Sequence, residues 1–334
     1  MKPIRVAQIG TMHDHASPTF HSMLRPPEFF DVVGCAEICP DRENRLYKER
    51  PHYTVEQLLD MDLDAVAIET EEDRATEFAQ MFADRGVHVH MDKPGSHGTA
   101  SFNRLADTLQ ARGKVFHLGY MYRYNPVVMD VMQRALDGEW GDIYAVEAHM
   151  SVHHGIQKHR WLCRYPGGMM YFLGCHLVDL VVRLQGEPEE VIALNSRTGQ
   201  DVPECEDYGF AVLKYKNGVS FVKSCSAEYN GFDRRQLVIC GTKGTVEINP
   251  LEIHVPGDGH LQKTSYRITG DKEEVAIFGN DNAKFRDSVH YDRYDLMMRS
   301  FAQYVRGEKE NPYSYEYEKK VFAIFMKCCG VKEE

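Results

Sequence analysis

The sequence predicts an α/β protein of two domains, with a parallel sheet in the first third and an α+β domain with a largely antiparallel, open sheet in the remainder. Its 334 residues suffice for two domains with buried cores. The first third alternates short apolar runs with amphipathic stretches of helix length, whereas successive strand-like runs without intervening helices follow later. We expect the domains to be residues 1–123 and 124–334, with the boundary close to Asn125-Pro126.

The parallel sheet is predicted from apolar runs separated by helix-length segments, since this spacing favours right-handed strand–helix–strand crossovers. Two of the intervening helices, Glu72–Arg85 and Thr99–Arg112, carry apolar residues at helical spacing. Each is followed by a glycine, which favours the end of a helix. The expected strands are Ile4–Ile9, Phe30–Ile38, Ala65–Ile68, Val87–His90 and Val115–Leu118.

The antiparallel sheet is predicted from a hairpin and its continuation. Tyr208–Tyr215 and Val219–Glu228 are expected to pair through a tight turn in which Asn217-Gly218 supplies the positive φ angles. Gln236–Cys240 and Thr245–Ile248 extend the pair as a meander. Helices are expected over Val127–Leu136, Met170–Leu184, Tyr291–Val305 and Tyr315–Cys328, the last two packing back on the body.

Composition argues against several classes of protein. Lysine and arginine number 39 against 50 aspartates and glutamates, a net charge of −11, and no basic run could follow a phosphate backbone, so we expect no nucleic-acid partner. No apolar stretch approaches the roughly 20 residues that span a bilayer. The chain also starts without the apolar segment of a signal peptide, and its nine cysteines lack paired spacing. We therefore expect a cytoplasmic protein with reduced thiols and no membrane partner.

The loop after the first expected strand is a candidate phosphate-binding turn, because backbone N–H groups and the dipole of the next helix converge there. Gly10 is present, but Met12 and His15 stand where a G-x-G-x-x-G pattern has its second and third glycines. A plain strand-to-helix turn is the alternative. Gly10, Thr11, Met12 and His13 are predicted to bind a dinucleotide cofactor.

Glu37 closes the second expected strand, where a carboxylate can accept hydrogen bonds from the adenosine ribose hydroxyls. Such a carboxylate favours NAD over NADP, because it would repel the 2′-phosphate of NADP. The alternative is an exposed glutamate that only ends a strand. Thr70 and Asp92 are also predicted to contact the cofactor.

Two further segments could carry chemistry. Lys93 follows the fourth expected strand, and Pro94 favours an extended conformation that directs the lysine amine off the carboxyl edge, where open α/β sheets bind ligands. His176 and Asp179 are three residues apart in an expected helix and so share a face, with Phe172 one turn earlier. The alternatives are a surface lysine and a histidine of the core.

These residues resemble the Gfo/Idh/MocA (glucose-fructose oxidoreductase, inositol dehydrogenase, rhizopine catabolism) family of nicotinamide-dependent sugar oxidoreductases over nearly the whole chain. Asp92-Lys93-Pro94 stands where the family has Glu-Lys-Pro, Gly119–Pro126 where it crosses between domains, and Gly174-x-His176-x-x-Asp179 matches its second-domain helix. The resemblance implies an N-terminal Rossmann domain holding NAD(H) or NADP(H). It also implies a C-terminal domain whose open sheet often makes subunit contacts, hence a homodimer or homotetramer, and a sugar or cyclitol bound between Lys93 and His176.

The resemblance implies oxidation of an alcohol or reduction of a ketone, in which the nicotinamide carries the hydride. His176 is the candidate base, oriented by Asp179, and Lys93 would bridge substrate and nicotinamide ribose and stabilise an alkoxide. Phe172, however, stands where most members have an aspartate, and its ring cannot share a proton. The candidate substrate contacts are Tyr120, Tyr122, Arg123, His153 and Trp161.

Other activities remain open. Tightly bound NAD could be reduced and reoxidised within one turnover, giving elimination, hydrolysis or epimerisation of a glycoside. Phe172 and the unusual first loop motivate this alternative.

A metal-dependent hydrolase or lyase could use His13-x-His15, with His88, His90 and His117 on later strands. A barrel enzyme of that kind would need strand–helix alternation to the end of the chain, so the leading interpretation assigns no metal ligand. A binding or regulatory protein without turnover is a further alternative.

Overall fold

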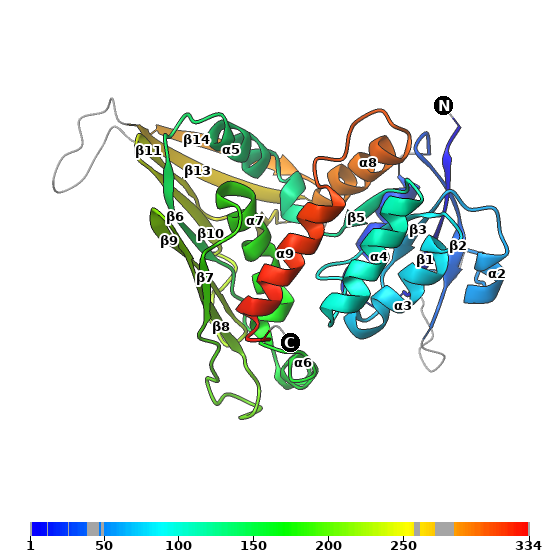
Figure 1. Cartoon of the computed structure of the whole chain (residues 1–334), viewed down its shortest axis with the longest axis horizontal. Helices are drawn as coiled ribbons and strands as arrows, with labels where there is room; N and C mark the ends of the chain where they lie inside the picture. The colour runs from blue at the N-terminus through cyan, green and yellow to red at the C-terminus, as the bar shows by residue number, and fades with distance from the viewer. Residues whose placement is uncertain are drawn as a thin grey trace. The chain divides into compact units, whose positions relative to one another are not determined.

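The chain forms two compact units in a computed structural model that describes residues 2–332 except 12, 26, 39–46, 48–49, 257–260 and 271–283 (Figure 1). Unit 1 comprises Met1–Met121 and Tyr294–Lys320, and unit 2 comprises Tyr122–Arg293 and Val321–Glu334. A late segment of the chain therefore belongs to the unit that contains the first residues. Among the described residues, no helix has the length and apolar character needed to cross a lipid bilayer.

Unit 1 is built on a parallel sheet in the order β2-β1-β3-β4-β5, which confirms the predicted parallel sheet. Its strands are β1 (Ile4–Ile9), β2 (Phe30–Ala36), β3 (Ala65–Ile68), β4 (His88–Met91) and β5 (Phe116–Leu118). Its helices are α1 (Ala16–Leu24), α2 (Val55–Leu59), α3 (Glu72–Ala83), α4 (Thr99–Ala111) and α8 (Arg293–Val305). Gly86 and Gly113 follow α3 and α4 with φ of +75° and +61°, so both predicted glycine stops are confirmed.

The order of the strands fixes where this sheet can bind a ligand. From β1 the chain moves outward to β2, then returns to the other side of β1 to place β3, β4 and β5. An isolated parallel bridge joins Cys35 of β2 to His52 on the side away from β1, where a doubly wound sheet has its next strand. Open sheets of this kind bind ligands at the carboxyl ends of the strands where the order reverses, here between β1 and β3.

Unit 2 is built on a larger sheet in the order β12-β13-β11-β10-β6-β9-β8-β7, with β14 paired to β13. Neighbouring strands are antiparallel except β6 and β9, so the sheet is largely antiparallel as predicted. Helices α5 and α7 lie against one face of it (Figure 1).

The elements of unit 2 and its borders are bounded as follows. The strands are β6 (Ile143–His149), β7 (Glu190–Ala193), β8 (Tyr208–Tyr215), β9 (Gly218–Cys225), β10 (Gln236–Gly241), β11 (Gly244–Ile248), β12 (Ile253–His254), β13 (Gln262–Gly270) and β14 (Lys284–Tyr291). The helices are α5 (Pro126–Leu136), α6 (Ile156–Leu162), α7 (Cys175–Gln185) and α9 (Tyr315–Cys328), with a 3-10 turn η2 (Met121–Tyr124) and a π turn η3 (Met170–Gly174).

The hairpin of β8 and β9 forms, but the turn geometry predicted for it is wrong. Tyr215 pairs with Gly218, so the turn consists of Lys216 and Asn217. Neither Asn217 nor Gly218 has a positive φ. Gly218 serves another purpose, because a Cβ there would lie 1.8 Å from the carbonyl oxygen of Tyr144 in the neighbouring strand β6. The glycine allows two strands to approach rather than allowing the chain to turn.

Two predicted helices begin differently in the structure. The segment from Met170 opens as the π turn η3, so the turn between Phe172 and His176 is wider than the α-helical turn expected there. Gly174 ends this turn, and a Cβ there would lie 2.3 Å from the sulfur of Met170, so the turn needs the space a glycine leaves. The helix expected from Tyr291 begins at Arg293, because Tyr291 is the last residue of β14.

Asn125 joins the first helix of unit 2 to its sheet. The side-chain oxygen accepts hydrogen bonds from the N–H groups of Val127 and Val128 (3.0 and 3.3 Å), which caps α5. Its amide nitrogen donates to the hydroxyls of Thr264 and Tyr291, each at 2.8 Å. One side chain thereby fixes both the start of a helix and its attachment to strands far along the chain.

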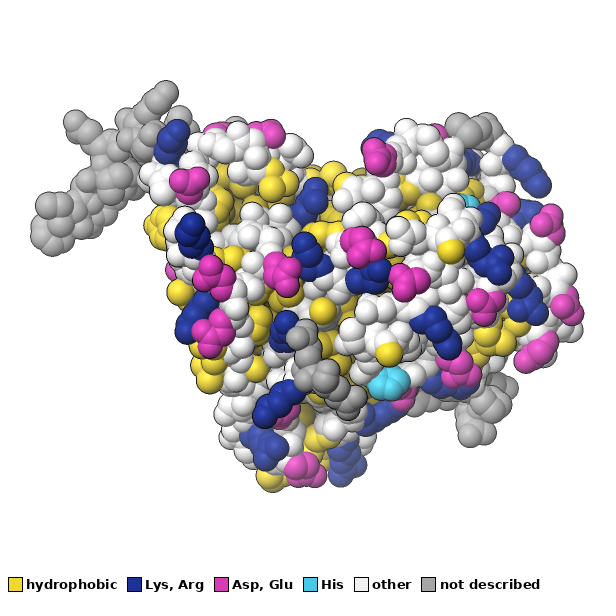
Figure 2. All heavy atoms as spheres, viewed as in Figure 1, with side chains coloured by type: hydrophobic (Ala, Val, Ile, Leu, Met, Phe, Trp, Pro, Cys, Tyr) yellow, Lys and Arg dark blue, Asp and Glu magenta, His cyan; other side chains and the backbone are white. Residues whose placement is uncertain are grey.

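Charges of both signs are mixed on one face of the molecule (Figure 2). On the face drawn in Figure 2, Lys and Arg side chains alternate with Asp and Glu side chains. This face therefore presents no continuous basic stripe of the kind that follows a phosphate backbone.

His88 makes the stability of unit 1 depend on pH. Its Nδ1 accepts a hydrogen bond from the N–H of Val115 (2.9 Å), and burial, aided by Lys114, lowers the pKa of His88 to about 4. Since the unfolded chain takes up this proton near pH 6.5, the stabilisation is present above that pH and is lost as the pH falls toward 4.

We predict that between pH 7 and pH 5 the free energy of unfolding falls by about 2 kcal/mol more in the wild type than in His88→Gln. Urea unfolding of both proteins at both pH values measures this free energy. Equal decreases in the two proteins would contradict the role given to His88.

Candidate active site

The carboxyl edge of the unit 1 sheet carries the predicted dinucleotide-binding residues. Gly10 ends β1 with φ of +86°, and a Cβ there would lie 2.4 Å from the carbonyl oxygen of Glu69, so the loop can turn this tightly only with glycine. The hydroxyl of Thr11 donates to the carboxylate of Glu37, which also accepts from the N–H of Ile38 at 2.8 Å. Glu37 therefore ties the first loop to the end of β2 and is not the exposed strand-end glutamate of the alternative.

Lys93 is buried at the end of β4. Its exposed fraction is 0%, which excludes the alternative of a surface lysine. The preceding Asp92 is also buried, and its charge interacts with that of Lys93. Lysine side chains are rarely buried without a charged partner. The buried pair therefore marks this strand end as chemically distinct from an ordinary turn.

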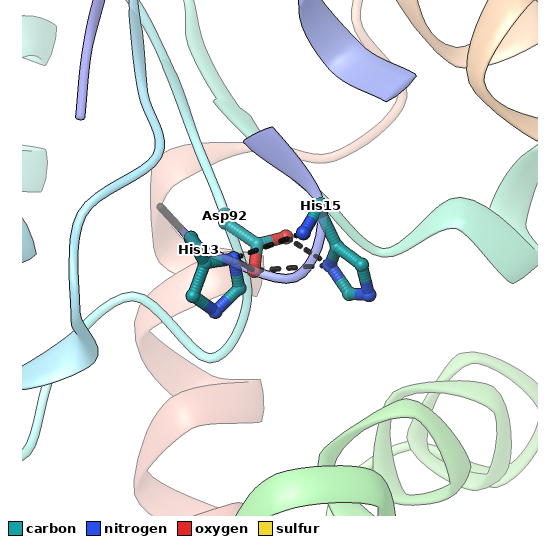
Figure 3. Close-up of side chains that lie close together, drawn as sticks. All are labelled: His13, His15 and Asp92. Atoms are coloured by element: carbon teal, nitrogen blue, oxygen red, sulfur yellow. Dashed lines mark hydrogen bonds and ion pairs between the residues drawn. The ribbon is translucent and has the colours of Figure 1, made fainter. Parts of the chain in front are cut away.

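Asp92 lies between two imidazole rings of the first loop, as Figure 3 shows. Its carboxylate oxygens are 3.0 and 3.1 Å from Nδ1 of His15, and one of them is 3.2 Å from Nδ1 of His13. The side chains of His13, His15 and Asp92 are only 5%, 14% and 7% exposed. These three residues, which we call the His–Asp cluster, have ligand atoms within 4.8 Å of one another, a spacing at which they could hold a metal ion.

The His–Asp cluster continues into a chain of buried titratable side chains along the sheet edge. Nε2 of His13 is 3.4 Å from Glu72, and its Nδ1 is 3.7 Å from Glu69. On its other side Glu69 is 3.6 Å from Nε2 of His90, whose Nδ1 lies 2.7 Å from Nδ1 of His117. Strands β3, β4 and β5 and the loop after β1 thus each contribute to one polar network inside the unit.

Burial and charge act in opposite directions on these groups. Burial lowers the pKa of His13, but Asp92, Glu69 and Glu72 together raise it well above its usual value. For His15 burial prevails over the attraction of Asp92 and lowers the pKa. Burial alone would raise the pKa values of Asp92 and Glu69, yet the neighbouring imidazoles hold both below their usual range. The carboxylates therefore remain ionised inside the protein.

Helix α8 covers this network, although it lies about 200 residues later in the chain. The ring of Tyr294 is 5.9 Å from that of His15, and the ring of Phe301 is 5.8 Å from His90 and 5.1 Å from His117. These contacts explain why Tyr294–Lys320 belongs to unit 1.

In unit 2, His176 and Asp179 lie near the start of α7, and both are buried. The ring of Tyr122 meets that of His176 edge to face, with centroids 5.0 Å apart. Asp179 accepts two hydrogen bonds from the guanidinium of Arg123, at 2.9 and 2.7 Å. Arg123, a predicted substrate contact, therefore ties the turn η2 to α7 through a buried ion pair.

Tyr122 belongs to a second buried charge cluster of unit 2. Its hydroxyl donates to Glu252 and accepts from Arg235 at 3.0 Å. Glu252 is fully buried and pairs with Arg235 (2.9 Å) and Arg293 (2.7 Å). Burial and the Glu252 charge raise the pKa of Tyr122 well above its usual value, so the phenol stays protonated. Its hydrogen bonds fix the ring against which His176 packs.

Phe172 lies in an aromatic cluster of unit 2. Its ring centroid is 5.3 Å from that of Trp161 and 5.7 Å from that of His154. The Lys158 ammonium lies 3.9 Å from both the Trp161 and the Phe172 ring centroids, within cation–π range. His153, another predicted substrate contact, stacks on the exposed ring of Tyr229 at 4.3 Å. Apolar faces and one cation therefore surround the position where the resemblance expected an aspartate.

The structure brings some predicted site residues together and adds others. Within unit 1 it joins Thr11 to Glu37 and His13 to Asp92. Thr70 and Tyr120 are both buried. Met12 lies outside the described residues. Glu69 and Glu72 were not predicted. Both follow β3 as Asp92 follows β4, so their place at a strand end was the signal that could have found them.

Two family models match the sequence. One, described as an oxidoreductase family with an NAD-binding Rossmann fold, matches residues 4–120, and the other, the GFO/IDH/MocA C-terminal domain, matches residues 128–247. Together they cover most of the chain, and each falls mainly on one of the two units.

Three individual proteins are similar to this chain, at 17–24% sequence identity. An uncharacterized oxidoreductase of Schizosaccharomyces pombe is 24% identical over 260 residues, 73% of this chain and 70% of that protein. The D-glucoside 3-dehydrogenase of Escherichia coli K12 is 21% identical over 216 residues, 58% of this chain and 61% of its own. The structure of the UDP-N-acetylglucosamine 3-dehydrogenase of Acidithiobacillus ferrooxidans has the same fold, with a TM-score of 0.79, 17% identity, and 98% of this chain and 97% of that chain covered. This chain belongs to the GFO/IDH/MocA oxidoreductase family, with an NAD-binding Rossmann fold followed by the family's C-terminal domain.

Proposed function

We propose that this protein is a dehydrogenase that uses NAD in preference to NADP to oxidise a hydroxyl group of a sugar, cyclitol or sugar derivative, or to reduce the corresponding ketone. The observation that carries the proposal is the completely buried Lys93 beside the buried carboxylate of Asp92, at the carboxyl edge of the parallel sheet. Burying an ammonium group costs free energy. A lysine kept there is suited to stabilise negative charge on a bound oxygen.

The residues at this edge fit a dinucleotide. Gly10 lets the chain turn closely from β1 toward α1, whose first turn contains no acidic side chain. The N–H of Ser17 could receive a phosphate oxygen there, whereas the N–H of Ala16 donates to the carbonyl of His13 and Pro18 has none. Glu37 offers a carboxylate at the end of β2, where a ribose would be bound. When bound, the nicotinamide supplies the acceptor or donor of hydride.

The resemblance to the family implies roles for two side chains. Lys93 would hold the substrate oxygen and stabilise it as it loses its proton. His176 would take that proton, because an imidazole exchanges protons near neutral pH. We assign Asp179 a positioning role, since its ion pair with Arg123 fixes the start of the helix that carries His176.

A sugar-type substrate is supported by two similar proteins. The D-glucoside 3-dehydrogenase and the UDP-N-acetylglucosamine 3-dehydrogenase are both named for oxidation of a sugar. In this chain, the partly exposed ring of Trp161 could pack against the apolar face of a sugar ring.

Lys93→Ala tests the central role. We predict a 100- to 1,000-fold loss of kcat/KM for NADH formation from any sugar that the wild type oxidises, as expected for loss of one charge-stabilising donor. Lys216→Ala, which changes an exposed turn lysine, should retain wild-type activity. Wild-type rates in Lys93→Ala would show that the buried amine has no part in the reaction.

His176→Ala tests the assignment of the base. Removing a positioned base should lower kcat by about 100- to 10,000-fold while substrate still binds. His254→Ala, which changes an exposed histidine of unit 2, is the matched control. If kcat is unchanged and only KM rises, His176 binds substrate and another group removes the proton.

Glu37→Ser tests cofactor choice. Removing the carboxylate that would repel a 2′-phosphate should strengthen NADP binding relative to NAD by about tenfold or more. Nucleotide titration followed by protein fluorescence measures both affinities. An unchanged ratio would mean that Glu37 does not contact the ribose and acts only through its hydrogen bonds with Thr11 and Ile38.

Phe172 favours a second candidate activity, the redox-neutral conversion of a glycoside. An aromatic ring lies where most family members would place a proton-sharing carboxylate, and it packs against Trp161 and the Lys158 ammonium. Loss of glycoside without net NADH formation would favour this activity. Stoichiometric NADH would favour the dehydrogenase.

A further inference from the structure

We propose that the His–Asp cluster, His13, His15 and Asp92, binds a divalent first-row transition-metal ion such as Zn²⁺ or Fe²⁺. The cluster lies wholly within unit 1, and the proposal goes beyond the dehydrogenase activity because it requires neither nucleotide nor turnover. It uses the side chains of His13 and Asp92, two of the predicted cofactor contacts, together with His15.

Two of the three donor separations in the cluster match those around a metal ion. Zinc binds imidazole nitrogen and carboxylate oxygen at about 2.0–2.2 Å, which places neighbouring ligand atoms about 3.0–3.5 Å apart. In the cluster Nδ1 of His15 is 3.0 Å, and Nδ1 of His13 is 3.2 Å, from carboxylate oxygens of Asp92. Figure 3 shows the carboxylate facing both rings, so the three donors converge on one region.

Glu72 orients His13 for this role. Nε2 of His13 is 3.4 Å from the Glu72 carboxylate, a distance at which the ring N–H can donate to it. Nδ1 is 3.2 Å from Asp92, so a metal ion that displaces the proton at Nδ1 would meet this nitrogen beside the Asp92 oxygen. Metal-bound histidines usually donate their other ring N–H to a carboxylate in this way.

The surroundings favour an added positive charge. Asp92, Glu69 and Glu72 are all buried within 4 Å of the His13 ring, and both carboxylate oxygens of Glu69 lack a hydrogen-bond partner in the part of the chain the structure describes. If the imidazoles are neutral, Lys93 offsets one of these three charges. Either a divalent cation or protons on the two imidazoles would balance the remaining two negative charges. A measurement of metal binding distinguishes these two possibilities.

The donor set selects the class of metal. Mg²⁺ and Ca²⁺ prefer sites made entirely of oxygen ligands. Two imidazoles and one carboxylate suit zinc, iron and related ions, and leave coordination positions for water or for an oxygen of a bound ligand.

The test uses the untagged, full-length protein after chelator treatment, with Co²⁺ as a spectroscopic probe. The chain has 16 histidines, so stoichiometry and variants must distinguish this site from scattered binding. We expect one Co²⁺ per chain with visible ligand-field absorption, displaced by Zn²⁺. His15→Gln and Asp92→Asn should weaken binding at least tenfold, and Glu72→Gln about 10- to 100-fold through loss of the carboxylate that accepts from Nε2 of His13.

His97→Gln, which changes an exposed histidine of the same unit, should bind Co²⁺ like the wild type. Should Asp92→Asn fail to fold, His15→Gln and Glu72→Gln give the answer. No stoichiometric Co²⁺ binding, or equal affinity in wild type, His15→Gln and Glu72→Gln, would overturn the proposal and leave protons as the balancing charge. Because no substrate or nucleotide is present, such a result leaves the proposed dehydrogenase activity to its own tests.

Discussion

The burial of carboxylates at the carboxyl edge of the parallel sheet is the constraint on which unit 1 depends. Glu69 and Glu72 follow β3, and Asp92 follows β4, where parallel strands bring their ends together. Ionised carboxylates removed from water need positive charge beside them. The imidazoles of the first loop and the buried Lys93 meet this need, and α8 closes the network with Tyr294 and Phe301.

Unit 2 uses buried charge in a different way. Arg123 with Asp179, and Glu252 with two arginines, connect segments that are distant in the chain. Breaking such a pair would leave one charge buried and unpaired, so each pair holds its segments in place. The consequence for function is that His176 sits on a helix fixed by one of these pairs and packs against Tyr122, which is held by the other.

The sequence predicted those features that follow from local patterns. The strands of unit 1 were visible because each is a short apolar run between amphipathic helices, and Lys93 and Glu37 because they stand at strand ends. The last helices were expected to pack back on the body, but not that α8 would join unit 1, since this depends on tertiary contacts of Phe301. The pairing of Arg123 with Asp179 joins residues 56 positions apart and leaves no periodic signal. Gly218 was assigned to a turn, although it is needed for the approach of a third strand.

The central claim is that the carboxyl edge of unit 1 binds a nicotinamide nucleotide. The most direct measurement is calorimetric titration of the full-length wild-type protein with NAD and with NADP, after any retained nucleotide has been removed and identified. We predict one nucleotide bound per chain, with NAD tighter than NADP, because Gly10 allows the close turn toward the N-terminus of α1 and the Glu37 carboxylate can bind the ribose. Absence of binding of either nucleotide to the folded, nucleotide-free protein would contradict it.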